Sequence, residues 1–470
     1  MKLGKIAKNL SYSVLANGTN TLISLILVLF VPKMLGVEEY SYWQLYLFYA
    51  SYVGFFHFGW ADGIYLKFGG KKYEDLNKGY FHSQFWLLTA FEIILAIIFA
   101  AITLFLDIDV NKETVLLAVA LCCVLQIPRT FLQYLLQTTN RIVDYAKNYL
   151  LEKIVYAILV VSFLGIGVKS FEVLIGADLF ARGLTLFLLS RECKDIVKGK
   201  MGTIETAITE AWDNIGIGIK LMIANIAGQL LVGIVRFAIE DHWSIETFGK
   251  VSLTITASNL LLAFISAVSV VIYPMLKNMD QEHFSETYKK MRNVLMIAVL
   301  GLLIVYYPAK EVLSWWLPKY AESLRYMALL FPMCVFESKL TLLISTYLKA
   351  LRKEKQYMII NWSVILITAV CTGITVYILD SLILAIAMLP ILMGIRCCLG
   401  EMILMRELNI SIWKDIAAEF ILAFLFILVS WNIDSWLSML IYLGAYFIYI
   451  IWKKDTIKEC LSGIKKLRDK

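Results

Sequence analysis

The sequence has few charged residues and little of what a soluble catalytic or metal site needs. Of its 470 residues, 17% are charged and 60% are hydrophobic, whereas a soluble domain has about 25% and about 45–50%. The four histidines lie far apart, and there is no CxxC pair and no Walker phosphate loop. The sequence therefore offers no zinc site, no disulfide framework and no direct use of ATP. A cytosolic enzyme, a secreted domain and a nucleic-acid-binding protein are all excluded, because lipid must solvate so much apolar surface.

What the sequence has in abundance is long apolar runs, and a membrane-spanning helix needs about 20 such residues. The ninth run reaches that length only if it extends through Trp315, Trp316 and Leu317. The sequence predicts an all-α polytopic membrane protein with about fourteen transmembrane helices. The predicted spans are 9–32, 40–61, 80–106, 113–136, 146–168, 171–190, 214–239, 248–274, 294–308, 323–348, 357–379, 381–405, 412–431 and 434–452.

The positive charges between the runs predict the orientation. If the N-terminus is cytosolic, the inside segments hold 30 Lys and Arg residues and the outside loops hold 6, as the positive-inside rule requires. Both termini are then cytosolic, and the first run is a retained span and not a signal peptide. The longest cytosolic loops are 191–213 and 275–293, and the second is predicted to lie along the membrane surface.

An internal repeat divides the chain. A shift of 208 residues places Asn17 on Asn225, Glu38 on Glu246 and Tyr40 on Phe248. Because the orientation recurs after six spans, the repeat predicts two six-helix bundles related by a pseudo-twofold axis along the membrane normal. The predicted segments are a first bundle at 1–205, a second at 206–410, two extra spans at 411–452 and a basic cytosolic tail at 453–470.

Polar residues recur on one face of four predicted spans, since each helical residue turns about 100°. The stripe of the second span carries Gln44, Ser51 and Asp62, and the repeat aligns the stripes of the first and seventh spans. We expect these stripes to line one hydrated cavity, although small polar residues also knit membrane helices together. The predicted cavity residues are Asn17, Thr21, Asp62, Lys220, Asn225, Gln229, Arg236 and Lys250.

Further charges lie inside the predicted spans, where they are costly and usually face protein or water. Asp178 and Arg182 are four residues apart and predict a structural pair within one helix. Arg129 and Glu152 predict a structural bridge between adjacent helices. Arg396 and Glu401 lie near cytosolic ends, where side chains can snorkel to water. Glu337 lies near mid-span without a partner in its own helix, which makes it a candidate for proton or Na⁺ coupling.

The segment from Asn20 to Tyr40 carries a recognisable pattern: an apolar first helix, then Lys33, Leu35-Gly36, Glu38-Glu39 and an aromatic residue. In this pattern the sequence resembles the Wzx-type polysaccharide and O-antigen flippases of the multidrug/oligosaccharidyl-lipid/polysaccharide (MOP) superfamily. Ser41 departs from it where Gly is usual, while Phe248-Gly249 keeps it in the second half. The resemblance implies two MATE-like six-helix bundles around a central cavity that opens alternately to each side.

The resemblance also implies a function. The chain would be a flippase, and not an enzyme, that moves polyprenyl-diphosphate-linked oligosaccharides across the bacterial cytoplasmic (inner) membrane for surface polysaccharide or lipopolysaccharide biosynthesis. Its partners would be this lipid-linked substrate, the bilayer, and a glycosyltransferase or glycan polymerase, with no nucleic acid and no cofactor beyond Na⁺ or H⁺. The diphosphate would require cations, and Arg236, Lys250 and Lys220 are the best candidates.

Two other functions remain open. A cation-coupled multidrug exporter of the same fold would need mainly acidic cavity residues, whereas the charge on the seventh and eighth spans is mainly basic, with Glu240 as the exception. A polytopic polysaccharide polymerase or ligase would need a large external loop with Arg and His, but the longest outside loop has about fifteen residues.

Overall fold

The computed structural model describes residues 3–200, 202–277 and 284–454, and within them the side chains outside 3–17, 261 and 263–277. In these ranges the chain is helical with short connections, and it forms no strand. The predicted tail lies outside the described residues from 455 onward, and the predicted loop at 275–293 lies partly outside them.

The chain forms two compact units, 1–226 (unit 1) and 227–470 (unit 2), each with its own packed interior. The division falls inside one continuous helix, α9 (Ile204–His242). Unit 2 therefore includes the helices of the two extra spans as well as those of the second bundle. The predicted boundaries at 205/206 and 410/411 between the two bundles and the extra spans stay predictions.

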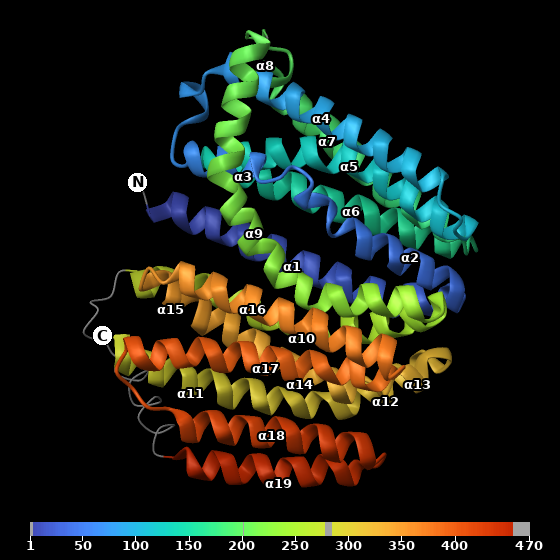
Figure 1. The fold of residues 1–470 in the computed structure, drawn as a ribbon, viewed down its shortest axis with the longest axis vertical. Coiled ribbons are helices and arrows are strands. Elements are labelled where there is room, and N and C mark those ends of the chain that lie inside the picture. The colour runs from blue at the N-terminus through green and yellow to red at the C-terminus, as the bar shows by residue number, and fades with distance from the viewer. Residues whose placement is uncertain (1–2, 201, 278–283, 455–470) are drawn as a thin grey trace. The chain divides into compact units, whose positions relative to one another are not determined.

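Unit 1 is built around four long helices, α4 to α7, which Figure 1 shows running side by side. α4 packs on α5, α5 on α7, and α6 on both α7 and α1. The helices of unit 1 are α1 (Leu3–Met34), α2 (Val37–Ala50), η1 (Val53–Phe55), α3 (Trp60–Lys67), η2 (Tyr73–Asp75), α4 (Lys78–Leu104), α5 (Val110–Thr138), α6 (Ile142–Gly165), α7 (Phe171–Glu192), α8 (Lys194–Val197) and the first part of α9.

Unit 2 has its core around α14, which packs on α10, α11, α17 and α18. Two of its spans contain π-helical segments, η6 and η7. Besides the second part of α9, the helices of unit 2 are α10 (Ile245–Lys277), α11 (Phe284–Leu302), η4 (Leu303–Val305), α12 (Tyr306–Trp316), η5 (Pro318–Tyr320), α13 (Ala321–Leu324), α14 (Met327–Lys339), η6 (Leu340–Ile344), α15 (Ser345–Ala350), α16 (Glu354–Gly373), η7 (Ile374–Ile378), α17 (Leu382–Glu407), α18 (Trp413–Asn432) and α19 (Trp436–Trp452).

These helices account for the predicted membrane spans. Among the described residues, ten helices are long and apolar enough to cross a membrane, and 18–34 and 436–452 form shorter apolar helices. The ninth span extends from Phe284 to Trp316 through α11, η4 and α12, so it does reach the tryptophans, as its length required. The prediction of an all-α polytopic membrane protein with about fourteen spans is confirmed.

Polar residues fix where several helices begin. Asn77 and Asp109 accept hydrogen bonds from backbone amides at the starts of α4 and α5, which satisfies donors that a helix cannot pair internally. The Tyr42 hydroxyl also donates to Asp109, at 2.8 Å. This hydrogen bond and the backbone amides hold the pKa of Asp109 below its usual range. Asp109 therefore stays an ionised cap in the loop between α4 and α5.

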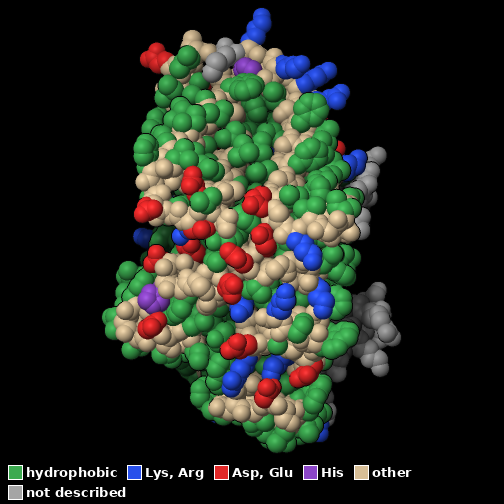
Figure 2. All heavy atoms as spheres, turned by 90° about the vertical axis from the view of Figure 1, so that its right-hand side faces the viewer, with side chains coloured by type: hydrophobic (Ala, Val, Ile, Leu, Met, Phe, Trp, Pro, Cys, Tyr) green, Lys and Arg blue, Asp and Glu red, His purple; other side chains and the backbone are tan. Residues whose placement is uncertain are grey.

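Hydrophobic side chains cover large areas of the molecular face drawn in Figure 2. Ile97, Leu104, Phe105 and Ile448, for example, are all more than 60% exposed. A water-soluble protein would not expose so much apolar surface. These surfaces are those of a multi-pass membrane protein that meets the hydrocarbon of the bilayer.

The prediction of a surface helix over 275–293 is wrong for its second part. α11 begins at Phe284 and continues into the ninth span. Arg292, counted in the sequence as a cytosolic loop residue, is completely buried in unit 2. Its position is explained by buried carboxylates on neighbouring helices, which attract it away from water.

Candidate functional site

Three of the predicted cavity residues lie on the exposed side of α9. Lys220 and Asn225 belong to unit 1 and Gln229 to unit 2, and all three side chains are exposed. Lys220 makes no ion pair with any described residue. Lys220 lies six residues into the predicted span 214–239, where exposure to hydrocarbon would be costly. We therefore expect its ammonium to reach water, either in a cavity or by snorkelling to the cytosolic surface. The role of these residues in a cavity stays a prediction.

The other predicted cavity residues differ in their surroundings. Thr21 on α1 is half-buried, and the side chain of Asn17 lies outside the described residues. Arg236 donates a hydrogen bond to Ser252 on α10, at 2.9 Å, and its guanidinium lies 5.2 Å from the centre of the Phe248 ring. These contacts give Arg236 a role in joining α9 to α10 beside its predicted role in binding an anion.

Lys250 on α10 is the second predicted cation of unit 2. Its side chain is half-buried, and it makes no ion pair with any described residue. With Lys220, it is one of the two intramembrane lysines among the predicted cavity residues that have no carboxylate partner within the described part of the chain. Both therefore stay candidates for binding an anionic substrate.

The second span is broken, and this corrects the prediction of one continuous helix over 40–61. α2 ends at Ala50 and α3 begins at Trp60. Phe58 and Gly59 adopt left-handed backbone conformations, with φ of 49° and 85°. The polar stripe of Gln44, Ser51 and Asp62 therefore does not lie on one helical face, because the chain changes direction between Ser51 and Asp62.

Asp62 lies buried in the first turn of α3, after the break. His57 is also buried, and its Nε2 lies 3.8 Å from Asp62 Oδ2. The Nδ1 of His57 accepts a hydrogen bond from the Gly59 amide, at 3.0 Å, which stabilises the turn. Broken membrane helices are tolerated where side chains satisfy the freed backbone groups, and they often occur at binding sites. The predicted role of Asp62 in a cavity stays a prediction.

α3 and the first part of α9 touch through their backbones. A Cβ added at Gly59 would lie 2.5 Å from the Ile219 amide nitrogen, and one added at Gly63 or Gly218 would overlap backbone atoms of the facing helix. Real Cβ atoms do not approach so closely, so each of these positions requires glycine. Glycines four residues apart, as in Gly59 and Gly63, permit this close approach of membrane helices.

A buried polar cluster continues the same contact toward α4. Gln84 accepts hydrogen bonds from the indole of Trp60, at 2.8 Å, and from the amide of Asn214, at 3.2 Å. Gln84 also donates to the carbonyl of Ala207, at 2.9 Å, and Asn214 contacts the Tyr80 hydroxyl. The cluster joins α3, α4 and α9 within unit 1.

Unit 1 also contains a chain of charged residues that crosses its interior. Arg182 donates to Asp178 at 2.6 Å, and Arg129 on α5 forms an ion pair with Glu152 on α6. Both predicted structural pairs are confirmed. Gln126 links the two pairs, because its side-chain oxygen accepts from both arginines.

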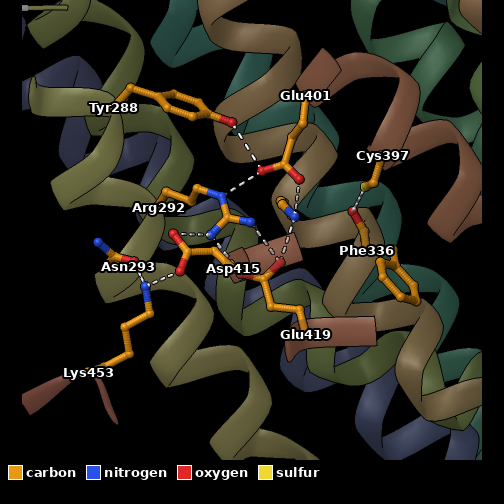
Figure 3. A network of polar contacts seen from close by, with 10 residues as sticks. Tyr288, Arg292, Asn293, Phe336, Cys397, Glu401, Asp415, Glu419 and Lys453 are labelled. Carbon is orange, nitrogen blue, oxygen red and sulfur yellow. Dashed lines mark hydrogen bonds and ion pairs between the residues drawn. The ribbon is translucent and has the colours of Figure 1, made fainter. Parts of the chain in front are cut away.

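A second buried network joins α11, α14, α17, α18 and the C-cap residue of α19 in unit 2 (Figure 3). At its centre, Arg292 binds Glu401 and Glu419 at 2.6–2.8 Å, and Lys339 binds the same two carboxylates. These four side chains are at most 1% exposed. The network requires the extra spans, because Glu419 lies on α18 while Arg292 and Lys339 lie on α11 and α14.

The network continues toward one end of α19. Lys453 binds Asp415 at 2.6 Å and donates to Asn293 at 2.9 Å. The Tyr288 hydroxyl donates to Glu401, at 3.3 Å. The network thus contains three cations and three carboxylates and is balanced in charge. The expectation that Glu401 only snorkels to water is wrong, because Glu401 is completely buried.

Glu337 has the partner that its own helix does not provide. Its carboxylate lies 3.9 Å from the guanidinium of Arg396 on α17, and Thr341 donates to it at 3.3 Å. Arg396 is 3% exposed and donates to Asn361 at 2.8 Å, so the expectation that it snorkels is wrong. A coupling ion would have to compete with Arg396 for Glu337, and the coupling role stays a prediction.

The described residues contain no group of three or more His, Cys, Asp or Glu side chains arranged to hold a metal ion. Both carboxylate oxygens of Glu92 on α4 are buried and make no hydrogen bond to any described residue. The sequence predicted the pairs Arg129–Glu152 and Asp178–Arg182 but not the network of unit 2, because Glu401 and Glu419 meet Arg292 and Lys339 only through packing. The signal for such ion pairs in the sequence was the number of charges of both signs inside the predicted spans.

Comparisons with known proteins address the fold. No family model matches the sequence, and no curated protein does. The structure is similar to that of the lipid II flippase MurJ in an inward-closed conformation, with a TM-score of 0.63 and 15% identity over 95% of this chain and 98% of that one. The chain has the fold of the MurJ and MATE transporters. An inward-facing multidrug resistance MATE transporter of the MOP superfamily is also similar, with a TM-score of 0.54 and 12% identity over 87% and 95% of the two chains.

The fold that the resemblance implies is thereby confirmed. The match to MurJ extends over nearly the whole of both chains, while the division into two six-helix bundles stays a prediction. The Wzx type and the substrate stay predictions.

Proposed function

We propose that the chain is a flippase that moves polyprenyl-diphosphate-linked oligosaccharides across the bacterial cytoplasmic membrane for surface polysaccharide biosynthesis. The observation that carries this proposal is the pair of unpaired intramembrane lysines, Lys220 and Lys250, in a chain with the fold of a lipid II flippase. A sugar headgroup cannot cross hydrocarbon, because its hydroxyls would lose their hydrogen bonds to water. A hydrated path with cations would replace that water and bind the diphosphate.

The mechanism is physical and breaks no covalent bond, so the chain acts as a transporter and not as an enzyme. The units would open alternately to each side of the membrane, while the polyprenyl tail stays in lipid. Na⁺ or H⁺ would drive the cycle through Glu337, by competing with Arg396 for the carboxylate. The glycosyltransferases or polymerase of the same pathway would be its partners, and an O-antigen repeat unit is one substrate of this class.

A multidrug exporter is the second candidate, because a multidrug resistance transporter shares the fold. It would bind cationic drugs, and the unpaired lysines argue against it. A polymerase or ligase fits less well, because the described loops between the outer helix ends, such as 105–109 and 433–435, are short.

Charge reversal tests the proposed substrate. We expect Lys220→Glu or Lys250→Glu to reduce surface glycan at least about 10-fold, because losing one charge-assisted hydrogen bond and adding a repulsive carboxylate costs more than about 1.4 kcal/mol. The measurement is surface polysaccharide staining in a deletion strain complemented with each variant, together with the amount of lipid-linked repeat unit in the cell. The exposed Lys319 provides the control, since Lys319→Glu should export normally.

Normal glycan in the double variant Lys220→Glu/Lys250→Glu would contradict the role of both lysines. Normal glycan in the deletion strain itself, with no second transporter present, would contradict the flippase assignment. An exporter of cationic drugs would instead keep or gain activity with an added carboxylate.

We also propose that both termini are cytosolic. Cys193 is a poor reporter of this topology, because it is completely buried and burial raises the pKa of its thiol to about 11. Single cysteines at the exposed positions Lys72 and Asp107, in a cysteine-free background, should report better. We expect a membrane-impermeant thiol reagent to label Asp107→Cys in intact cells and Lys72→Cys only in inverted vesicles, and the reverse pattern would overturn the orientation.

A further inference from the structure

The group of charged side chains inside unit 1 has one more positive than negative charge. Its cations are Arg129, Lys153 and Arg182, and its carboxylates are Glu152 and Asp178. Each arginine has a carboxylate of its own, whereas the ammonium of Lys153 lies 3.4 Å from Glu152, which already pairs with Arg129. Among the described side chains of unit 1, one cation of this group therefore has no carboxylate of its own.

The network of unit 2 provides the contrast. There, three cations meet three carboxylates, and the group is self-sufficient as a structural element. Burying an unpaired charge costs several kcal/mol, so an unbalanced group needs either water or an anion. The charged group of unit 1 therefore lacks one negative charge, which water or an anion would have to compensate.

No other residue of the helices around Lys153 supplies the missing negative charge. α6 packs on α1, α5 and α7, and residues 1–34 contain no Asp or Glu at all. The remaining carboxylates of α5 to α7 lie near helix ends: Glu113, Asp144, Glu172 and Glu192. Glu92 lies on α4 and makes no hydrogen bond to any described residue.

Lys153 also has the most exposed side chain of this charged group. Its side chain is 26% exposed, against 11% for Arg182 and 2–5% for Arg129, Glu152 and Asp178. It lies at the middle of α6, where exposure to hydrocarbon would be costly for an ammonium. We therefore expect the exposed part of Lys153 to face water, from which a polar ligand can reach it.

We propose that Lys153, together with Arg182 of the same charged group, forms an anion-binding site of unit 1 that takes a phosphate or diphosphate group. Lys153 supplies the uncompensated charge, and the pairs Arg129–Glu152 and Arg182–Asp178 hold the site in place. Tyr46 supports it from α2, because its hydroxyl donates to Asp178 at 2.6 Å. Only the identity of the natural ligand rests on the proposed function. That ligand would be the diphosphate of the lipid-linked substrate.

Thermal unfolding of the purified full chain in detergent tests the site. Inorganic pyrophosphate should raise the apparent unfolding temperature of the wild type by at least about 2 °C over sodium chloride of equal ionic strength, since a ligand that binds the folded state stabilises it. Lys153→Gln should lose this shift. Lys147→Gln should keep it, because Lys147 is an exposed lysine of the same helix without an ion pair among the described residues.

A second variant separates ligand binding from a structural role. Without any anion, Lys153→Met should unfold at the same or a higher temperature than the wild type, because two complete ion pairs remain after the surplus charge is removed. A lower unfolding temperature would mean that Lys153 is a structural partner of Glu152, and this would overturn the proposal. Equal protection of the wild type and Lys153→Gln by pyrophosphate, or no protection of the wild type, would also overturn it.

The source of the anion is settled by comparing farnesyl diphosphate with inorganic pyrophosphate. Protection at lower concentrations of farnesyl diphosphate would support a site for lipid-linked diphosphates, and equal protection would support a site for the free anion. Because binding is measured without transport, a chain that exports no glycan would still show the site. Failure of the proposed function is thus distinguishable from failure of this inference.

Discussion

Glu419→Gln is expected to lower the free energy of unfolding by about 3–5 kcal/mol, the range for breaking a buried ion pair from one side. Glu419 binds both Arg292 and Lys339 at 2.7–2.8 Å and is 1% exposed. Without its charge, two buried cations share Glu401 alone. The measurement is the amount of monodisperse protein that survives heating in detergent, followed by size-exclusion chromatography.

The matched comparison is the double variant Lys339→Met/Glu419→Gln, which removes one cation with one carboxylate. Because Arg292 and Glu401 remain paired, we expect the double variant to recover most of the lost stability. The exposed pair Lys290–Glu286 on α11 provides the control, since Glu286→Gln should cost at most about 1 kcal/mol. A double variant as unstable as Glu419→Gln would show that charge balance does not determine the stability of unit 2.

Gly63→Ala and Gly218→Ala are expected to destabilise unit 1 by about 3 kcal/mol each, the upper part of the range for overpacking. In both cases the new methyl group would overlap backbone atoms of the facing helix, and a backbone cannot move aside as a flexible side chain can. We also expect weaker glycan export, because the variants push the first part of α9 away from α3. Protein yield, thermal stability and surface glycan are the quantities to compare.

Gly216 is the control for this pair, because a Cβ added there meets nothing within 4 Å. Gly216→Ala should leave stability unchanged or raise it by up to about 1 kcal/mol, since alanine is the better helix former. If Gly63→Ala matched Gly216→Ala, the backbone contact between α3 and α9 would not exist in solution.

The sequence was sufficient to predict the spans, because the length of an apolar run depends on the bilayer and not on tertiary packing. The extension of the ninth span through Trp315 and Trp316 followed from this requirement. The Asp178–Arg182 pair was predictable as well, since residues four apart share a helix face. Predictions of this kind need only local information.

The break in the second span was not predictable by the same means. The run 40–61 stays apolar through Phe58 and Gly59, and a single glycine in such a run does not reveal whether the helix continues. Arg292, Arg396 and Glu401 were misplaced for a related reason. A charge near the end of a run indicates a helix end unless a partner buries it, and the partners of these residues lie on helices distant in sequence.

The partition of α9 between the units constrains how the chain could be divided. Its first part carries Asn214 and Gly218, which contact α3 and α4 of unit 1, whereas Arg236 contacts α10 of unit 2. A cut in the linker before α9 would assign Asn214 and Gly218 to the wrong fragment, and a cut after Ile226 would sever a helix. If the two halves were separate polypeptides, a segment of one would have to cross over and pack inside the other, as in a domain-swapped dimer. Covalent continuity through α9 therefore makes this contact intramolecular and independent of protein concentration.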